Sequence, residues 1–460
     1  MIKLRTWLPL LVALITYQPS AYALDLLQAW QSAIANDKDY AVAQAGYAVL
    51  APKQQQAQAL WRPNVMVSGT LGVGFQDSNT QGAQFSTPAF GQSNGVNFNT
   101  SINGGLSSRL ALTANQPLYD AKRRAEQQQL LKSADLTELE WQAQRQSLML
   151  KVAQQYFNVA LAQKNLQVMQ QQVSSIQKIA VEMRDRFNIG SSPITDMHEA
   201  EARLAAMQAQ QLSAQLDLEN KRNLLADTLG QTPESIITLL PQTQLNQVNT
   251  SALDVWLDQA KLDNFNVRMN QVYVQIAEQE AQKYSFKSSI KLDAIAQVAR
   301  DELDGSGSYG SANNTQTNAV VGVQVSMPLS TGGYRDAKQD EATKLLSKAK
   351  LEVDRSRQQA AQQIRQTYLD MNISKSRLDA LQQSLKAGQL RLDATKLGRQ
   401  VGDRTTLDVL NAENEVAATQ LNLVQTQVAV LMSRLQLSAL TAALNETVLS
   451  EVNQYLVVQQ

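Results

Sequence analysis

The stretch Gly190-Ser-Ser-Pro-Ile-Thr-Asp196 recurs 212 residues later in the chain as Gly402-Asp-Arg-Thr-Thr-Leu-Asp408. The same shift matches Tyr156 with Tyr368. A repeat of this length is far longer than the units of solenoid proteins. The pattern therefore predicts a duplicated architecture with internal pseudo-symmetry, in which each half contributes one equivalent turn.

The segments around each turn predict unusually long helices. Residues 119–189 contain neither glycine nor proline. A continuous helix over them would extend about 105 Å at 1.5 Å per residue. From Leu166 to Phe187, apolar residues recur close to the period of a left-handed coiled coil. A second helix is expected to run back after each turn, over about residues 194–229 and 405–443.

Four shorter segments show the alternation that is typical of transmembrane strands. Apolar residues occupy alternate positions, with small or polar residues between them, in residues 65–75, 102–112, 290–298 and 319–327. Asp77–Asn97 and Asp301–Asn318 are rich in Gly, Ser, Asn and Gln and are expected to be long polar loops that face the cell exterior. Four strands cannot close a barrel alone, and an open sheet edge is not stable in lipid. Several chains are therefore expected to share one barrel, and three chains would supply twelve strands.

The composition argues against several classes of function. The chain carries 41 basic and 41 acidic residues without a cluster of Lys and Arg, so nucleic acid is not an expected partner. The absence of cysteine excludes disulfides, thiolate metal sites and lipidation of an N-terminal cysteine. The only histidine, His198, lacks neighbouring ligands, so no metal site is predicted. No nucleophile–histidine arrangement or phosphate-binding loop indicates an enzyme, and no cofactor is expected.

The first 23 residues have the pattern of a signal peptide. Lys3 and Arg5 precede an apolar stretch from Trp7 to Ile15, and Ala21-Tyr-Ala23 forms a cleavage site of small residues. An uncleaved membrane anchor is the alternative, but the apolar stretch is shorter than the ~20 residues that a spanning helix needs. The sequence therefore predicts export across the inner membrane.

Two further motifs precede the long helices, Asn115-Gln-Pro-Leu-Tyr-Asp120 and Ser326-Met-Pro-Leu-Ser-Thr-Gly-Gly333. Together with the turns in 187–196 and 401–410, they resemble motifs of the TolC-like family of outer-membrane efflux and secretion channels. The resemblance covers essentially all of the chain after residue 23. It implies a mixed α/β membrane protein that forms a homotrimer. A twelve-stranded β-barrel in the outer membrane, with four strands per chain, would be continued into the periplasm by a long α-helical coiled-coil barrel.

The repeat and the resemblance together divide the chain into parts. A signal peptide is followed by two structural repeats with a linker between them, and by a C-terminal tail. The strand hairpins are expected at 62–118 and 285–330, and the helical hairpins at 119–230 and 331–445. The expected boundaries of the five parts are 1–23, 24–230, 231–252, 253–445 and 446–460.

The resemblance also implies a gate at the periplasmic tips of the helical hairpins. Asp408 matches an aperture carboxylate of the family. Arg404 and Asp196 match an arginine and an aspartate that pair between neighbouring protomers in the closed state. Two positions depart from the pattern. Asn411 stands where a second aperture carboxylate is expected, and Arg399 replaces an aromatic residue that helps to hold the tip closed.

A simpler interpretation applies to the same residues. Asp196 and Asp408 lie in the first turn of expected helices, where a carboxylate interacts favourably with the helix macrodipole and can act as a cap. Capping and gating are compatible. The glycines of the two turns are expected to supply special backbone angles. The tip turns are expected at Gly190, Pro193, Gly402 and Thr405.

The resemblance implies an outer-membrane channel of a tripartite export system, located in the outer membrane and extending into the periplasm. Its expected partners are a periplasmic adaptor protein, an inner-membrane transporter of the ABC or proton-driven type, and outer-membrane lipid. The cargo is open between protein, in type I secretion, and small molecules, in multidrug efflux of the RND type, with a slight preference for protein. A periplasmic coiled-coil adaptor without a barrel is the alternative from another class, but an adaptor does not need the four alternating segments.

Overall fold

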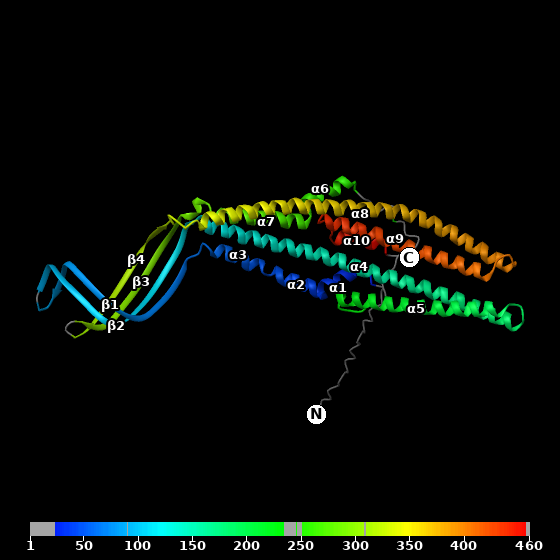
Figure 1. Cartoon of the computed structure of the whole chain (residues 1–460), viewed down its shortest axis with the longest axis horizontal. Helices are drawn as coiled ribbons and strands as arrows, with labels where there is room; N and C mark the ends of the chain where they lie inside the picture. The colour runs from blue at the N-terminus through cyan, green and yellow to red at the C-terminus, as the bar shows by residue number, and fades with distance from the viewer. Residues whose placement is uncertain (1–23, 90, 234–244, 246–250, 308–309, 457–460) are drawn as a thin grey trace, which may run out of the picture. The chain divides into compact units, whose positions relative to one another are not determined.

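A computed structural model describes residues 24–89, 91–233, 245, 251–307 and 310–456 of the chain (Figure 1). The expected signal peptide and most of the expected linker lie outside these residues. The chain divides into two compact units. Unit 1 comprises residues up to 46, 139–268 and 356–460, and unit 2 comprises residues 47–138 and 269–355. The long helices α4 (Ala121–Asn188) and α8 (Tyr334–Gln400) contribute to both units.

Unit 2 contains one antiparallel sheet with the strand order β1-β2-β3-β4 (Figure 1). Its cross-strand register separates an apolar face from a polar face. Val67, Leu112, Val298 and Ala319 are successive partners across the four strands on the apolar face. Thr70, Arg109, Asp301 and Gln316 are successive partners on the polar face. The strands are β1 (Asn64–Thr87), β2 (Gly91–Asp120), β3 (Lys291–Gly307) and β4 (Gly310–Ser326).

The expectation of two long polar loops in this sheet is wrong. Strand pairing continues to the rung Thr87–Gly91 in the first hairpin and to Gly307–Gly310 in the second, so most of both stretches is strand. Antiparallel pairing joins backbone groups, and small polar side chains are compatible with it. The pairing of β1 with β2 contains three register shifts. One of them lies between Thr80 and Ala83, next to Gly82 with φ 70°.

Short helical segments pack beside the long helices in unit 2. Lys53 of α3 (Leu50–Ala59) donates to the Thr137 hydroxyl of α4 over 2.9 Å. Gln129 of α4 donates to Glu280 of α7 (Phe265–Lys283) over 2.9 Å. The short 3-10 helix η1 (Phe286–Ser289) leads from α7 into β3. At the start of α4, the Asp120 carboxylate accepts from the Arg123 amide at 3.0 Å and thereby caps the helix.

The core of unit 1 is helical. Trp30, Tyr156 and Phe157 are fully buried in it, and the Tyr156 hydroxyl donates to the Leu24 carbonyl over 2.8 Å. α4 alone spans 68 residues, about 100 Å of helix. The remaining helices of this unit are α1 (Leu26–Asn36), α2 (Lys38–Tyr47, whose last residue belongs to unit 2), α5 (Ile194–Leu229), α6 (Leu253–Asp263), α9 (Thr406–Leu440) and α10 (Glu446–Gln454).

Two equivalent contacts hold the ends of the returning helices in unit 1. The Asn36 side-chain amide donates to the Leu229 carbonyl at the end of α5 over 2.8 Å. The Asn264 side-chain amide donates to the Leu440 carbonyl at the end of α9 over 2.8 Å. Both bonds satisfy a carbonyl that has no partner within its own helix. The segment expected as a C-terminal tail contributes α10, and Leu449 and Val452 of that helix are buried.

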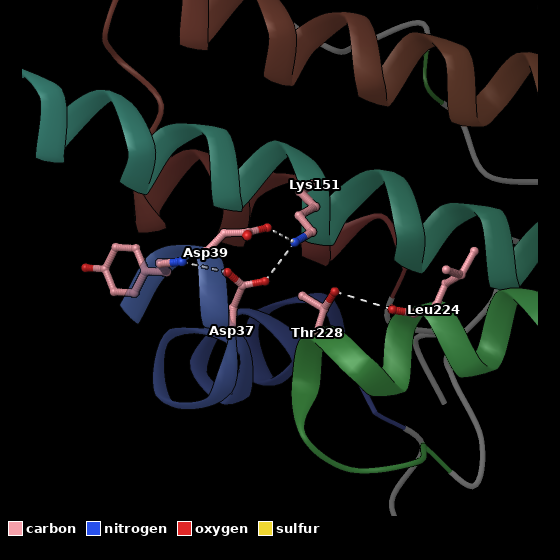
Figure 2. A network of polar contacts seen from close by, with 6 residues as sticks. Asp37, Asp39, Lys151, Leu224 and Thr228 are labelled. Atoms are coloured by element: carbon pink, nitrogen blue, oxygen red, sulfur yellow. Dashed lines mark hydrogen bonds and ion pairs between the residues drawn. The ribbon is translucent and has the colours of Figure 1, made fainter. Parts of the chain in front are cut away.

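Ion pairs connect the α1–α2 junction and the start of α2 to α4 in unit 1, and of their members only Asp37 is buried. Figure 2 shows Lys151 between Asp37, at 2.8 Å, and Asp39, at 3.0 Å. The second oxygen of the Asp37 carboxylate accepts from the Tyr40 amide at 2.8 Å. Burial raises the pKa of Asp37, but the hydrogen bonds and the charge of Lys151 outweigh it and leave this pKa below its ordinary value. Among the described residues, no helix has both the length and the hydropathy of a membrane span.

Candidate gate at the helical tips

The first tip turn connects α4 to α5 within unit 1. Gly190 has φ 74°, a left-handed conformation that favours glycine, and its amide donates to the Phe187 carbonyl at 2.9 Å. Pro193 occupies the N-cap position of α5 and makes no side-chain capping bond. Instead, the Ser192 hydroxyl donates to the Asp196 carboxylate over 3.1 Å. Asp196 thus lies in the first turn of α5, with an exposed side chain.

The second tip turn connects α8 to α9 and has a complete cap. Gly402 has φ 83°. The Asp408 amide donates to the Thr405 hydroxyl at 3.1 Å, and the Thr405 amide donates to the Asp408 carboxylate at 2.9 Å. This reciprocal pair is a capping box. The capping role that the sequence suggested for Asp408 is therefore present in the structure.

The same contacts set the protonation of Asp408. The hydrogen bond from the Thr405 backbone amide, followed by that from its hydroxyl, holds the pKa of Asp408 below its ordinary value. The nearby charge of Arg404 acts in the same direction. Asp408 is therefore a carboxylate at neutral pH and keeps its charge in mildly acidic solution.

Arg404 and Asp196 border one groove but do not touch each other. The groove has a volume of about 510 Å³ and lies between the two tip turns. Arg404 lies over Gly398, where an added Cβ would come within 2.8 Å of the arginine Cγ. Neither Arg404 nor Asp196 has an ion-pair partner in the part of the chain that the structure describes. The pair that the family resemblance implies is thus not formed within one chain.

The structure adds an ion pair that the sequence analysis missed. Arg399, in the last turn of α8, pairs with Glu182 of α4, which also pairs with Arg186 at 2.8 Å. Burial raises the pKa of Glu182, but the hydrogen bond and charge of Arg399, together with those of Arg186, leave it below the ordinary value. The spacing of Glu182 and Arg186 is visible in the sequence. The contact with Arg399 is not, because the partners are 217 residues apart.

Further polar contacts join the two helical hairpins above the tips. Glu413 of α9 pairs with Lys396 of α8 at 2.9 Å and accepts from the Ser175 hydroxyl of α4. Gln172 of α4 donates to Asn414 of α9 over 2.9 Å. A small apolar cluster lies beside these contacts and includes Ile176, Ile179, Ala180, Met183, Ala200 and Leu410. The tip region is therefore held within one chain by alternating polar and apolar contacts.

Asn411 and His198 lie outside these contacts, although Glu201, the neighbour of His198, also pairs with Arg184 of α4. Asn411 is exposed on α9. His198 lies 3.5 Å from Glu201 on the exposed side of α5. Within the described ranges, no group of three or more His, Asp and Glu side chains could hold a metal ion.

Comparison with known proteins identifies the family. A model of the outer membrane efflux protein family matches residues 29–231 and 256–443, which is well over half of the chain. The chain belongs to the outer membrane efflux protein family. The family predicted from the tip motifs and helix-entry motifs is thus confirmed.

The chain has relatives that are named as outer membrane, outer membrane efflux and protease secretion proteins. The outer membrane protein TolC of Vibrio cholerae is 25% identical over 373 residues, which cover 78% of this chain and 83% of the relative. The proteases secretion protein PrtF of Dickeya chrysanthemi is 25% identical over 434 residues, which cover 93% of this chain and 90% of the relative. This chain is accordingly an export channel of the outer membrane that extends into the periplasm.

A solved structure has the same fold. The outer membrane protein VceC from Vibrio cholerae aligns with a TM-score of 0.69 at 18% identity, covering 91% of this chain and 95% of that chain. Both combine long helices with a sheet. The mixed α/β fold class is therefore confirmed at this level.

Proposed function

We propose that three copies of this chain assemble into one export conduit, a twelve-stranded β-barrel continued by a barrel of coiled helices. The observation that carries the proposal is the sheet of unit 2. Its outer strands β1 and β4 have no neighbouring strand on their outer sides among the described residues. In a membrane, unpaired backbone groups at a sheet edge cost several kcal/mol each, so pairing β4 of one copy with β1 of the next removes the cost.

The two faces of the sheet fit a barrel wall. Val67, Leu112 and Val298 are about half exposed or more in the single chain, although they are apolar. On the other face, Arg109 and Asp301 form an ion pair at 3.6 Å. An apolar exterior and a polar interior are the arrangement of outer-membrane barrels. Three copies of the Arg109–Asp301 pair would then line the lumen.

The domain boundaries of the sequence analysis belong to this proposal. A signal peptide at 1–23 directs the chain to export, and two repeats, 24–230 and 253–445, each supply one strand hairpin and one helical hairpin. The equivalent bonds Asn36–Leu229 and Asn264–Leu440 support the duplication, because each ties the end of a returning helix in the same manner.

The gate of this conduit is formed by the two tip turns. Arg404 of one copy pairs with Asp196 of its neighbour, and Asp408 from three copies surrounds the axis. Two observations support this assignment: both members of the pair border the groove, and neither is paired within its own described chain. Asp408 contributes a fixed negative charge because its pKa is held low. The Glu182–Arg399 pair takes the place of the aromatic contact of the family.

The conduit works passively with a periplasmic adaptor and an inner-membrane transporter, of the ABC or the proton-driven type, that supplies the energy. The likeness to PrtF favours type I protein secretion as its task, and the family model favours efflux of small molecules as the alternative. Co-purification of the tagged channel in its native host, followed by mass spectrometry, separates the two. An ABC transporter supports secretion, and a proton-driven pump supports efflux.

Cysteine pairs test the proposed barrel, since the chain has no native cysteine. Val67→Cys on β1 is combined with cysteine at Val321, Val323 or Val325 of β4, and oxidation is followed by non-reducing gels of outer membranes. At least one combination should give linked species up to a trimer. The matched control joins Val67→Cys with Val298→Cys on the inner strand β3 and should give none. A ladder that continues beyond three, or no linked species in any combination, would count against the trimer.

A further inference from the structure

A pocket rich in positive charge lies where the sheet of unit 2 meets its helices. It has a volume of about 500 Å³ and opens between the starts of α4, β3 and α8 and the end of α7. All of its lining residues belong to unit 2, and none of them is an aspartate or a glutamate. This basic pocket includes Lys122, Lys283, Lys291, Arg335, Ser289 and Tyr334.

The strand register places the sheet's part of the basic pocket on the polar face. Lys291 and Ser326 are partners on the last rung of β3 and β4, and the register runs without a shift to the rung of Asp301 and Gln316. The two rungs are ten residues apart on each strand, and side chains alternate between faces, so all four residues share one face. The proposed barrel turns this face to its lumen, whereas Val325 of the neighbouring rung lies on the opposite, apolar face. The pocket therefore borders the conduit at the end of the barrel that adjoins the helices.

Two of the four cations in the pocket are uncompensated. Lys122 and Lys291 have no ion-pair partner in the ranges that the structure describes. Lys291 stands opposite Asp120 in the strand register, but the Asp120 carboxylate accepts from the Arg123 amide at 3.0 Å and lies 3.8 Å from the Arg123 guanidinium. Free ammonium groups in a concave site without carboxylates attract an anion.

Ser289 supplies a buried hydroxyl donor in the same pocket. It is 8% exposed, and its hydroxyl oxygen accepts from the Arg335 guanidinium over 3.0 Å. Among the described residues, no acceptor takes the proton of this hydroxyl. The charges of Arg335 and Lys283 are already paired, with Asp336 at 3.5 Å and with Glu280 at 2.9 Å. An incoming anion would therefore meet two free lysines and one free hydroxyl donor.

These donors suit a small tetrahedral oxyanion. Hydrogen bonds from ammonium groups to phosphate oxygens are charge-assisted and strong. A lysine acts as a compact point charge, whereas the planar fork of an unpaired arginine would favour a planar carboxylate. A volume of this size is within the range of small-ligand sites.

We propose that the basic pocket binds the phosphate group of small solutes, so that three copies of the chain form a ring of anion sites around the conduit. Lys122 and Lys291 contact the phosphate oxygens, and Ser289 donates a hydrogen bond to them. The ring carries the opposite charge to the Asp408 carboxylates of the proposed gate. The inference rests on the proposed barrel, because only there does the polar face of the sheet line a lumen.

Isothermal titration calorimetry with inorganic phosphate on the assembled channel in detergent tests the site. The double variant K122Q/K291Q loses two charge-assisted bonds and should bind phosphate at least about tenfold more weakly than the wild type. The matched control K344Q/K348Q removes two exposed lysines of α8 outside the pocket and should bind like the wild type. The single variants K122Q and K291Q, each with a smaller loss, replace the double variant if it fails to fold.

Reversal potentials in a potassium chloride gradient test whether the site lies in the lumen. K122Q/K291Q removes two positive charges from each of three copies, so its reversal potential should shift toward stronger cation preference. Phosphate added to the wild type neutralises the same charges and should shift the potential in the same direction, with little effect on K122Q/K291Q. The control should behave like the wild type in both measurements.

Three outcomes overturn the proposal. Absence of phosphate binding by the wild type, or equal binding by K122Q/K291Q and the control, would remove the site. Phosphate binding that leaves every reversal potential unchanged would remove it from the lumen. Light scattering on the same samples gives the mass of the assembly, so a failure of the trimer is distinguished from a failure of the pocket.

Discussion

The guanidinium of Arg399 pairs with the carboxylate of Glu182 across the tips of α8 and α4. Both side chains are about one-third exposed or less, so solvent screens the pair only in part. The two helices belong to different hairpins of the chain. The pair therefore resists separation of α8 from α4.

Removing either partner should favour the open tip. A partly exposed ion pair contributes about 1 kcal/mol, which is about fivefold in the ratio of closed to open channels. Glu182→Gln and Arg399→Gln should each raise the conductance of single channels in a planar bilayer. The double variant should add little to either single variant, because both remove the same contact. Additive effects would show that the residues act separately.

The same pair predicts a response to acid. The pKa of Glu182 is below its ordinary value, so the contribution of the pair is complete above the ordinary glutamate pKa, about 4.3, and is lost as the pH falls through the lower value. Conductance of the wild type should therefore rise below about pH 4. Glu182→Gln should conduct more at neutral pH and lose this rise. An unchanged acid response in that variant would assign it to another carboxylate.

Arg404→Ser should loosen the contact between neighbouring copies. The expected results are higher conductance and greater sensitivity of cells to large antibiotics, because the proposed bond to Asp196 is lost in each of three copies. The cysteine pair Asp196→Cys with Arg404→Cys supplies the opposite test and should lock the copies together until a reductant is added. Wild-type conductance of Arg404→Ser, together with no linkage of the cysteine pair, would contradict the intersubunit contact.

Variants of Asp408 and Thr405 should distinguish a role in gating from a role in helix capping. Asp408→Ala removes both the cap and the aperture charge, and it should weaken cation preference and block by trivalent cations. Thr405→Ala removes the hydroxyl half of the cap and should destabilise the start of α9 by about 1 kcal/mol without changing selectivity. Reversal potentials in a salt gradient measure the selectivity. Equal selectivity of Asp408→Ala and wild type would leave Asp408 as a cap alone.

The two strand hairpins should present their turns to the cell exterior. An epitope inserted after Thr87 or after Gly307 extends a hairpin at its end and leaves the paired strands intact. Antibody should reach either epitope on intact cells. An insertion after Pro193 at the helical tip provides the control and should be reached only after the outer membrane is permeabilised. The reverse pattern of labelling would invert the proposed topology.

Local patterns predicted most of the elements of this fold. The glycine-free stretch at 119–189 contains α4, and the alternating segments coincide with parts of β1–β4, apart from Ile290 and Met327, which lie one residue outside β3 and β4. Strand length was underestimated between residues 77 and 97, because backbone pairing there does not require apolar side chains. At the tips, the position of Asp408 in the first turn of an expected helix indicated a cap that the structure contains. Local sequence patterns could not predict the Glu182–Arg399 contact, because it depends on how the two helical hairpins pack against each other.

The close approach of Arg404 to Gly398 has a genetic consequence. An added Cβ at position 398 would meet the arginine side chain at 2.8 Å, so even alanine there must displace it. A selection for strains with leaky outer membranes should therefore recover changes at an uncharged glycine as well as at the charged tip residues. Such alleles would owe their phenotype to a misplaced arginine, and second-site suppressors should map to the short stretch between the two positions.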